Sequence, residues 1–191
     1  MLTAAPKQIH IYLESNPNPN SLKFVVNEML IPDGMTFDFP HPASAEESPL
    51  AQELFMYPFV DRLFYMSNFV TITKKEDVEW IEVQETLKKH IKDFLESGKL
   101  ILDVKAPEAE AQEETETIKK IKAILDEYIR PAVEQDGGAI TFHSYLGKQV
   151  TVKLQGSCSG CPSSTITLKA GIENLFKKMM PEEVETVEAL G

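Results

Sequence analysis

Two cysteines are the residues of this sequence best suited to chemistry. The 191-residue chain contains no others, and both lie in the segment Gly156-Ser-Cys158-Ser-Gly160-Cys161-Pro162. A secreted domain held together by disulfides would carry more cysteines, spread along its length, so a lone C-x-x-C indicates metal binding or redox chemistry. Spacing by two residues lets both thiolates reach one metal centre.

The residues around the pair predict that it lies between a strand and a helix. Pro162 suits the first position of a helix, because the N–H that proline lacks has no partner there. The amides and partial positive charge at a helix N-terminus stabilise thiolate, the form that ligates metal or attacks a disulfide. Gly156 and Gly160 allow tight turns and bring backbone amides close to sulfur.

A lone C-x-x-C is compatible with a redox dithiol, a structural zinc site or an iron–sulfur cluster, and the first two remain open as alternatives. A thiol–disulfide oxidoreductase is the first, although Ser-Gly separates the cysteines, no tryptophan flanks the first, and the order of elements differs from a thioredoxin-like domain. Structural zinc is the second, but a closed site needs four ligands. The histidines do not supply the remainder, because His10, His41 and His90 lie in the first half and His143 sits within a predicted strand.

An iron–sulfur cluster resolves the ligand count by symmetry. Two chains that each contribute Cys158 and Cys161 supply the four thiolates that a cluster needs. A homodimer sharing one cluster follows. A site that bridges subunits at an exposed loop should lose its cluster easily, which suits a carrier better than a permanent electron-transfer centre.

Composition disfavours several classes of partner. The formal charge of −11 disfavours nucleic acid, which binds clustered Lys and Arg. No apolar run approaches the length of about 18 residues that crosses a bilayer, so we expect no membrane association. The first residues, Met-Leu-Thr-Ala-Ala-Pro-Lys, resemble neither a secretion signal nor an import peptide, and the expectation is a cytoplasmic chain.

An acidic segment separates two predicted domains. Residues 106–114 hold four acids, no base and no large apolar side chain, so they cannot bury enough surface to offset the entropy of ordering. We therefore predict an N-terminal domain over 1–105, a flexible acidic linker over 106–115 and a C-terminal domain over 116–191. Both are predicted to be α+β.

The first domain is predicted to be a mostly antiparallel sheet covered on one face. Apolar alternation and turn residues predict strands at 8–13, 22–26, 35–39, 61–65 and 69–73. Helices are predicted from 48 or 49 to about 56 and from about 76 to 96, the second with Ile81, Leu87, Ile91, Phe94 and Leu95 as its apolar residues. Asn16-Pro-Asn-Pro-Asn20 is interpreted as a rigid connector, and Trp80 as a packing residue.

The second domain is predicted to run helix, strand, strand, helix, strand. Its first helix carries an apolar stripe and contains Pro131, so we expect a kink or a split near Arg130. Asp136-Gly-Gly138 is interpreted as the end of this helix only. Strands follow at 139–146 and 149–154, then a helix at 162–180 and a strand at 184–190. The apolar residues of the two helices are Ile118, Ile121, Leu125, Tyr128, Ile129 and Val133, then Ile166, Leu168, Ile172, Leu175, Phe176 and Met179.

The chain resembles the Nfu family of iron–sulfur cluster carriers over nearly its whole length. The C-terminal half is similar to the NifU-type domain through three segments, which are Ile129-Arg-Pro-Ala-Val-Glu-Gln-Asp-Gly-Gly138, Val152-Lys-Leu-Gln-Gly-Ser-Cys-Ser-Gly-Cys-Pro-Ser-Ser-Thr165 and Leu168-Lys-Ala-Gly-Ile-Glu173. The N-terminal half is similar to the Nfu N-terminal domain through Asn16-Pro-Asn-Pro-Asn-Ser-Leu-Lys-Phe24, Ser48-Pro-Leu-Ala51, Phe69-Val-Thr-Ile-Thr-Lys74 and Asp77-Val-Glu-Trp80. Ala139 departs from the pattern, since an acidic or amide residue is expected after the double glycine.

The resemblance implies a function without catalytic turnover. A 4Fe-4S cluster would be held between two protomers by the positions that match Cys158 and Cys161, received from upstream assembly machinery and delivered to apo iron–sulfur proteins. The first domain, which has no set of metal ligands, would support the choice of client or the stability of the chain.

Overall fold

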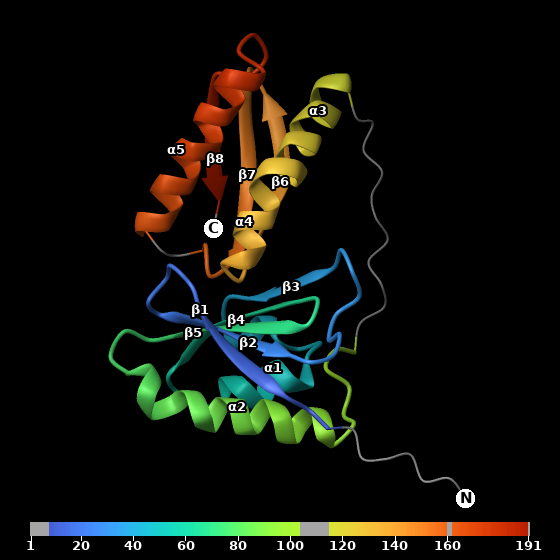
Figure 1. Ribbon diagram of the computed structural model, residues 1–191, viewed down its shortest axis with the longest axis vertical. Helices are drawn as coiled ribbons and strands as arrows, with labels where there is room; N and C mark the ends of the chain where they lie inside the picture. Colours follow the sequence, from blue (N-terminus) through green and yellow to red (C-terminus); the bar gives the residue numbers. More distant parts are fainter. Residues whose placement is uncertain (1–7, 104–114, 160–161, 191) are drawn as a thin grey trace, which may run out of the picture. The chain divides into compact units, whose positions relative to one another are not determined.

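The computed structural model describes residues 8–103, 115–159 and 162–190, with the side chains of 162–165 outside that description (Figure 1). Contacts divide the chain into two compact units, which lie in sequence largely on either side of residues 104–114. The predicted α+β class with two units is thereby confirmed. The acidic linker falls almost wholly outside the described residues, so the linker and the exact domain bounds stay predictions.

The first unit contains an antiparallel sheet with the strand order β1-β2-β5-β4-β3. The strands are β1 (Ile11–Ser15), β2 (Ser21–Val26), β3 (Thr36–Phe39), β4 (Val60–Met66) and β5 (Phe69–Lys74). A short 3-10 turn η1 (Pro42–Ser44) and the helices α1 (Pro49–Phe55) and α2 (Trp80–Glu96) complete it.

The strand register gathers apolar side chains on one face of this sheet. Leu13 pairs with Phe24, which pairs with Val70, which pairs with Tyr65. Because alternate residues of a strand point to the same side, these rows form one apolar layer. Both helices cover that layer, and their buried residues are Leu50, Ala51 and Leu54 of α1 and Val83, Leu87, Ile91, Phe94 and Leu95 of α2. The prediction of a sheet covered on one face is confirmed.

The start of α2 differs from its prediction. The helix begins at Trp80 rather than near residue 76, after the N-cap Glu79. Trp80 packs against the core and donates from Nε1 to the carbonyl of Pro19 at 3.1 Å, so it fixes the loop between β1 and β2. Ile81, which the apolar spacing placed inward, is 79% exposed, and Val83 takes the inward position.

The second unit follows the predicted order of elements. They are α3 (Glu116–Ile124), a π-helical turn η2 (Leu125–Ile129), α4 (Arg130–Gln135), β6 (Gly138–Leu146), β7 (Gln149–Gly156), α5 (Pro162–Met179) and β8 (Thr186–Leu190). Thr115 caps α3, since its side chain accepts from the N–H of Ile118. None of the described helices is long and apolar enough to cross a bilayer.

The split expected at Pro131 is present. The first helix of this unit breaks into α3 and α4, and the five-residue π turn η2 lies between them. Proline cannot donate the helical hydrogen bond and crowds the preceding turn, so the wider turn lies directly before it. Tyr128, within the turn, is 49% exposed, whereas Val133 after it is buried.

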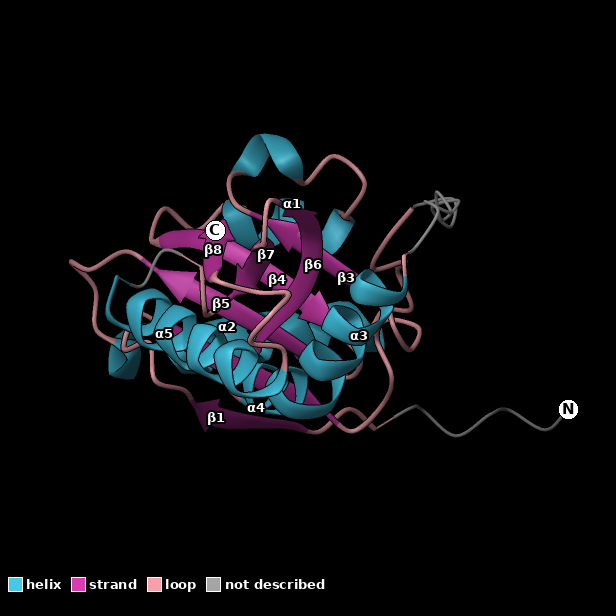
Figure 2. Cartoon of the chain, turned by 90° about the horizontal axis from the view of Figure 1, so that it is seen from above, coloured by secondary structure: helices cyan, strands magenta, loops and turns pink. Residues whose placement is uncertain are grey.

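Three helices cover one face of a sheet in the order β6-β7-β8 (Figures 1 and 2). β6 and β7 form an antiparallel hairpin, and β8 pairs in parallel with β7. Val150, Val152 and Leu154 point from β7 to one side, where α3, α4 and α5 supply the facing core. The predicted third strand is therefore confirmed.

Glu173 of α5 connects this helix to β8. Its carboxylate accepts from Lys177 Nζ at 2.5 Å and from the backbone N–H of Val187 at 3.2 Å. The Lys177 bond, followed by the Val187 N–H, lowers the pKa of Glu173. Ile166 and Met179 of the same helix, both predicted as apolar positions, are instead 70% and 42% exposed.

Two separate cores predict two separate unfolding transitions. Phe24 and Phe176 are both fully buried, one in each core. Phe176→Ala should destabilise the second unit by about 3–5 kcal/mol and leave the transition of the first in place, because the cavity affects only its own core. Phe24→Ala is the matched change and should act only on the first unit. Calorimetry of both variants checks this, and a common shift of both transitions would contradict it.

Candidate functional site

The loop between β7 and α5 carries the cysteine pair. β7 ends at Gly156, whose φ of +68° turns the chain, and α5 begins at Pro162 as predicted. Cys158 lies in the described part of this loop. Cys161 falls outside the described residues, so its place is known only from its position directly before Pro162 in the sequence.

Ser157 fastens the loop to the turn between α4 and β6. Its hydroxyl donates to the carbonyl of Asp136, and its N–H donates to the carbonyl of Gly137 at 3.4 Å. The N–H of Ser159 donates to the carbonyl of Gly156 at 3.1 Å and closes the loop on itself. The Asp136-Gly-Gly138 turn therefore supports the loop besides ending a helix, which the sequence interpretation did not include.

Gly138 lies directly against Cys158. A Cβ at this position would meet the Gln155 carbonyl oxygen at 2.6 Å, the Cys158 Sγ at 3.1 Å and the Cys158 N at 3.4 Å. The first distance leaves no room for a side chain at Gly138, and the second shows that the Cys158 sulfur packs closely on this glycine. Gly137 has a different task, since its φ of +77° makes the turn. The two adjacent glycines were the available signal, and the sequence gives no sign that one of them touches the cysteine.

The described part of the loop is more buried than predicted. Ser157, Cys158 and Ser159 are 2%, 6% and 4% exposed, so the expectation of an exposed loop is wrong for these three residues. The hydrogen bonds of Ser157 and the contact with Gly138 draw the loop onto the turn, and the Asn18 side chain donates to the Ser157 carbonyl at 3.0 Å. Cys158 packs with the core and lines a mostly apolar concavity, whose other residues are Pro17, Ala132, Val133, Asp136, Thr167 and Leu168.

The histidines lie elsewhere, as expected. His10, His41 and His143 are exposed. His90 makes two hydrogen bonds, from Nδ1 to the Tyr57 hydroxyl and from Nε2 to the Glu53 carboxylate, each at 3.0 Å. These bonds connect α2 with α1 and the residues that follow it. Within the described ranges, no group of three or more His, Cys, Asp or Glu side chains could hold a metal ion.

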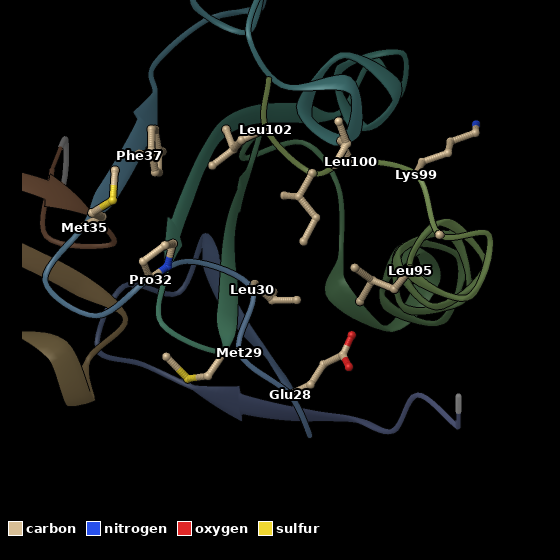
Figure 3. Close-up of a pocket in the computed structure, with 12 residues that line it drawn as sticks. Glu28, Met29, Leu30, Pro32, Met35, Phe37, Leu95, Lys99, Leu100 and Leu102 are labelled. Atoms are coloured by element: carbon tan, nitrogen blue, oxygen red, sulfur yellow. The ribbon is translucent and has the colours of Figure 1, made fainter. Parts of the chain in front are cut away.

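The first unit contains a larger concavity of about 490 Å³ (Figure 3). Its walls come from the β2–β3 connection, β3 and the end of α2, and its lining is Glu28, Met29, Leu30, Pro32, Met35, Phe37, Leu95, Gly98, Lys99, Leu100, Ile101 and Leu102. Glu28 is the single carboxylate among these residues. A single carboxylate with no His, Cys or Asp beside it among the described residues is a poor metal site, so the cysteine loop is the better candidate.

Comparison with known families agrees with the division into two units. Residues 11–98 match the family described as scaffold protein Nfu/NifU N terminal, and residues 121–188 match the NifU-like domain. The chain is also similar to the solution structure of a NifU-like protein from Saccharomyces cerevisiae, with 26% identity and a TM-score of 0.48 over 55% of this chain and 95% of that one.

Curated relatives match along nearly the whole chain. The NFU1 iron-sulfur cluster scaffold homolog, mitochondrial, of Drosophila simulans is 41% identical over 191 residues, which cover 98% of this chain and 67% of the relative. The protein of the same name from Drosophila grimshawi is 43% identical over 181 residues, which cover 93% and 60%. The chain thus spans about two thirds of the length of these relatives.

The names of these relatives correct one expectation. They are called mitochondrial, so the expected cytoplasmic location is wrong. That expectation rested on the first few residues of the chain.

The two family matches cover both units in the expected order, and the relatives exceed 40% identity along both. The chain therefore belongs to the Nfu/NifU family of scaffold proteins.

Proposed function

We propose that this protein carries a 4Fe-4S cluster, held by Cys158 and Cys161 of two copies, and passes it to apo iron–sulfur proteins. The observation that carries the proposal is the position of Cys158, fixed against Gly138 in the loop that leads into α5. The relatives named iron-sulfur cluster scaffold support the class of cargo.

The donor set fits an iron–sulfur cluster better than other metals. Thiolates are the ligands that hold such clusters, and the chain has two cysteines in all. The described residues contain no carboxylate or imidazole group that completes a second metal site. A second copy of the chain is then the simplest source of the missing thiolates, and a homodimer with one shared cluster follows.

The absence of a side chain at Gly138 creates the space that the cysteine needs. With Cβ excluded, the sulfur can rest on the backbone of β6 and β7 while its other side faces the concavity lined by Thr167 and Leu168. Ser157, directly before the cysteine, bonds to the carbonyls of Asp136 and Gly137, directly before the glycine. The protein thereby presents one ligand from a fixed position.

Release follows from exchange of thiolates. An incoming cysteine of an apo-protein replaces Cys158 or Cys161 at iron, and each replacement transfers one ligand position to the acceptor. Cys158 is buried on its Gly138 side, so an incoming thiolate approaches it from the side that faces the concavity. We expect the cysteine that is more accessible to the incoming thiolate to be replaced first.

Replacement of the cysteines tests the ligands directly. After anaerobic reconstitution, the wild-type protein should contain about four iron atoms per dimer. Cys158→Ser, Cys161→Ser and the double variant should lose most of the iron and sulfide, because serine is a poor ligand for a cluster. They should also remain monomeric under the same conditions. Iron and sulfide analysis with sedimentation measures both properties.

The same variants separate the carrier from a thiol–disulfide oxidoreductase. An oxidoreductase would show a reversible disulfide of defined potential and catalyse exchange without iron. Retention of iron, sulfide and dimer by the double serine variant would show that the ligands are assigned wrongly.

Gly138→Ala tests the contact that positions Cys158. The added methyl group would crowd the Gln155 carbonyl at 2.6 Å and should cost about 1–3 kcal/mol through displacement of the strand and loop. A chelator should also remove the cluster faster from this variant than from the wild type, because Cys158 is displaced. Denaturant unfolding and the rate of bleaching measure the two effects.

Gly171→Ala is the matched control. Gly171 lies in α5 with nothing within 4 Å of the position that a Cβ would take. Alanine should be neutral there or stabilise the helix by up to about 1 kcal/mol, with the rate of cluster loss unchanged. Equal behaviour of the two variants would show that the approach of Gly138 to Cys158 has no functional weight.

A further inference from the structure

Ile166 is a large apolar side chain left in water beside the cysteine loop. It is 70% exposed and lies four residues after Pro162, on the first turns of α5. The inward residues of this helix are Leu168, Ile172, Leu175 and Phe176, so packing within the unit makes little use of Ile166. A β-branched residue also has no advantage over alanine for an exposed helix position.

The same helical turn borders a concavity. Thr167 and Leu168, the next residues along α5, line the hollow next to Cys158, and the rest of its lining is Pro17, Ala132, Val133 and Asp136. One short stretch of helix therefore carries a projecting apolar side chain and the edge of an apolar hollow. A surface of this kind can be complementary to itself, which is what a contact about a two-fold axis requires.

We propose that Ile166 lies in the contact between two copies of this chain when they share a cluster, an inference that rests on the function proposed above. Each copy contributes only two thiolates, so both cysteine loops must reach one small cluster. At a rise of about 1.5 Å per residue, Ile166 is roughly 6 Å along the axis from Pro162. Loops that share a cluster thus bring the two copies of this helical turn into reach of each other.

Charge on the same part of α5 favours this occupant. Lys169, three residues after Ile166, is exposed. The nearby carboxylate Glu173 accepts from Lys177 and from the Val187 N–H, and Lys169 also attracts it electrostatically. A cluster bound by four thiolates carries net negative charge, so a lysine from each copy at its border offsets that charge and reduces repulsion between the copies.

Ile166→Asp is the variant that tests the contact. In the reconstituted protein, the dissociation constant of the dimer should rise by about tenfold or more, as for a central apolar residue of an interface. Cluster loss should accelerate with dilution, because dissociation now limits it. Sedimentation over a concentration series and bleaching rates at two protein concentrations measure these effects.

Ile81→Asp is the matched control, because Ile81 is equally exposed on a helix, at 79%, but belongs to the first unit. It should behave as the wild type in both measurements. Ile166→Leu should retain most of the dimer, since it keeps the apolar volume. Circular dichroism of the apo-proteins should be the same for all variants.

The outcomes separate this inference from the function on which it rests. If Ile166→Asp dimerises and holds its cluster like Ile81→Asp, the inference is overturned while the carrier function stands. If it dimerises normally but transfers its cluster more slowly to an apo-acceptor, the surface receives clients and the dimer contact is again refuted. A wild type that acquires no iron and sulfide removes the proposed function, and this contact with it.

Discussion

The sulfur of Cys158 rests on a backbone position where no side chain fits. Gly138 makes this possible, and the surrounding structure is arranged so that the two residues meet. The hairpin β6–β7 places Gly138 opposite Gly156, and the positive φ values of Gly137 and Gly156 turn the chain at both ends of that pair. Ser157 then joins the two turns by hydrogen bonds. The position of the Cys158 sulfur thus depends on backbone geometry more than on neighbouring side chains.

This dependence explains what the sequence could predict at the site. A C-x-x-C before a proline predicts the candidate ligands and the helix that follows, because spacing and residue type carry that information. The supporting turn was interpreted only as the end of a helix, because a Gly-Gly pair serves that purpose in any fold. Its contact with Cys158 joins residues 20 positions apart and depends on strand register, which single-sequence patterns leave open. The burial of Ser157, Cys158 and Ser159 was not predicted for the same reason.

The fold was predictable where local signals were strong. Alternating apolar residues located the strands, and Pro131 marked the break between α3 and α4. Apolar spacing failed for Ile81 and Ile166, which are exposed although they are as apolar as their buried neighbours. Hydrophobicity shows that a residue can be buried, but the neighbouring elements decide whether it is. Exposure of such residues is therefore informative only once the fold is known.

The π turn between α3 and α4 changes which residues after it face the core. In an uninterrupted α-helix, Ile121 and Leu125 would share their inward side with Tyr128 and Ala132. The wider turn instead advances the inward side by one residue, so that Val133 is buried and Tyr128 and Ala132 face outward. Shortening the turn by one residue would rotate everything after it by about 100° and carry the Asp136 carbonyl away from Ser157. Deleting one residue from the π turn would thus break the hydrogen bond that holds the Cys158 loop, even though every cysteine and glycine is retained.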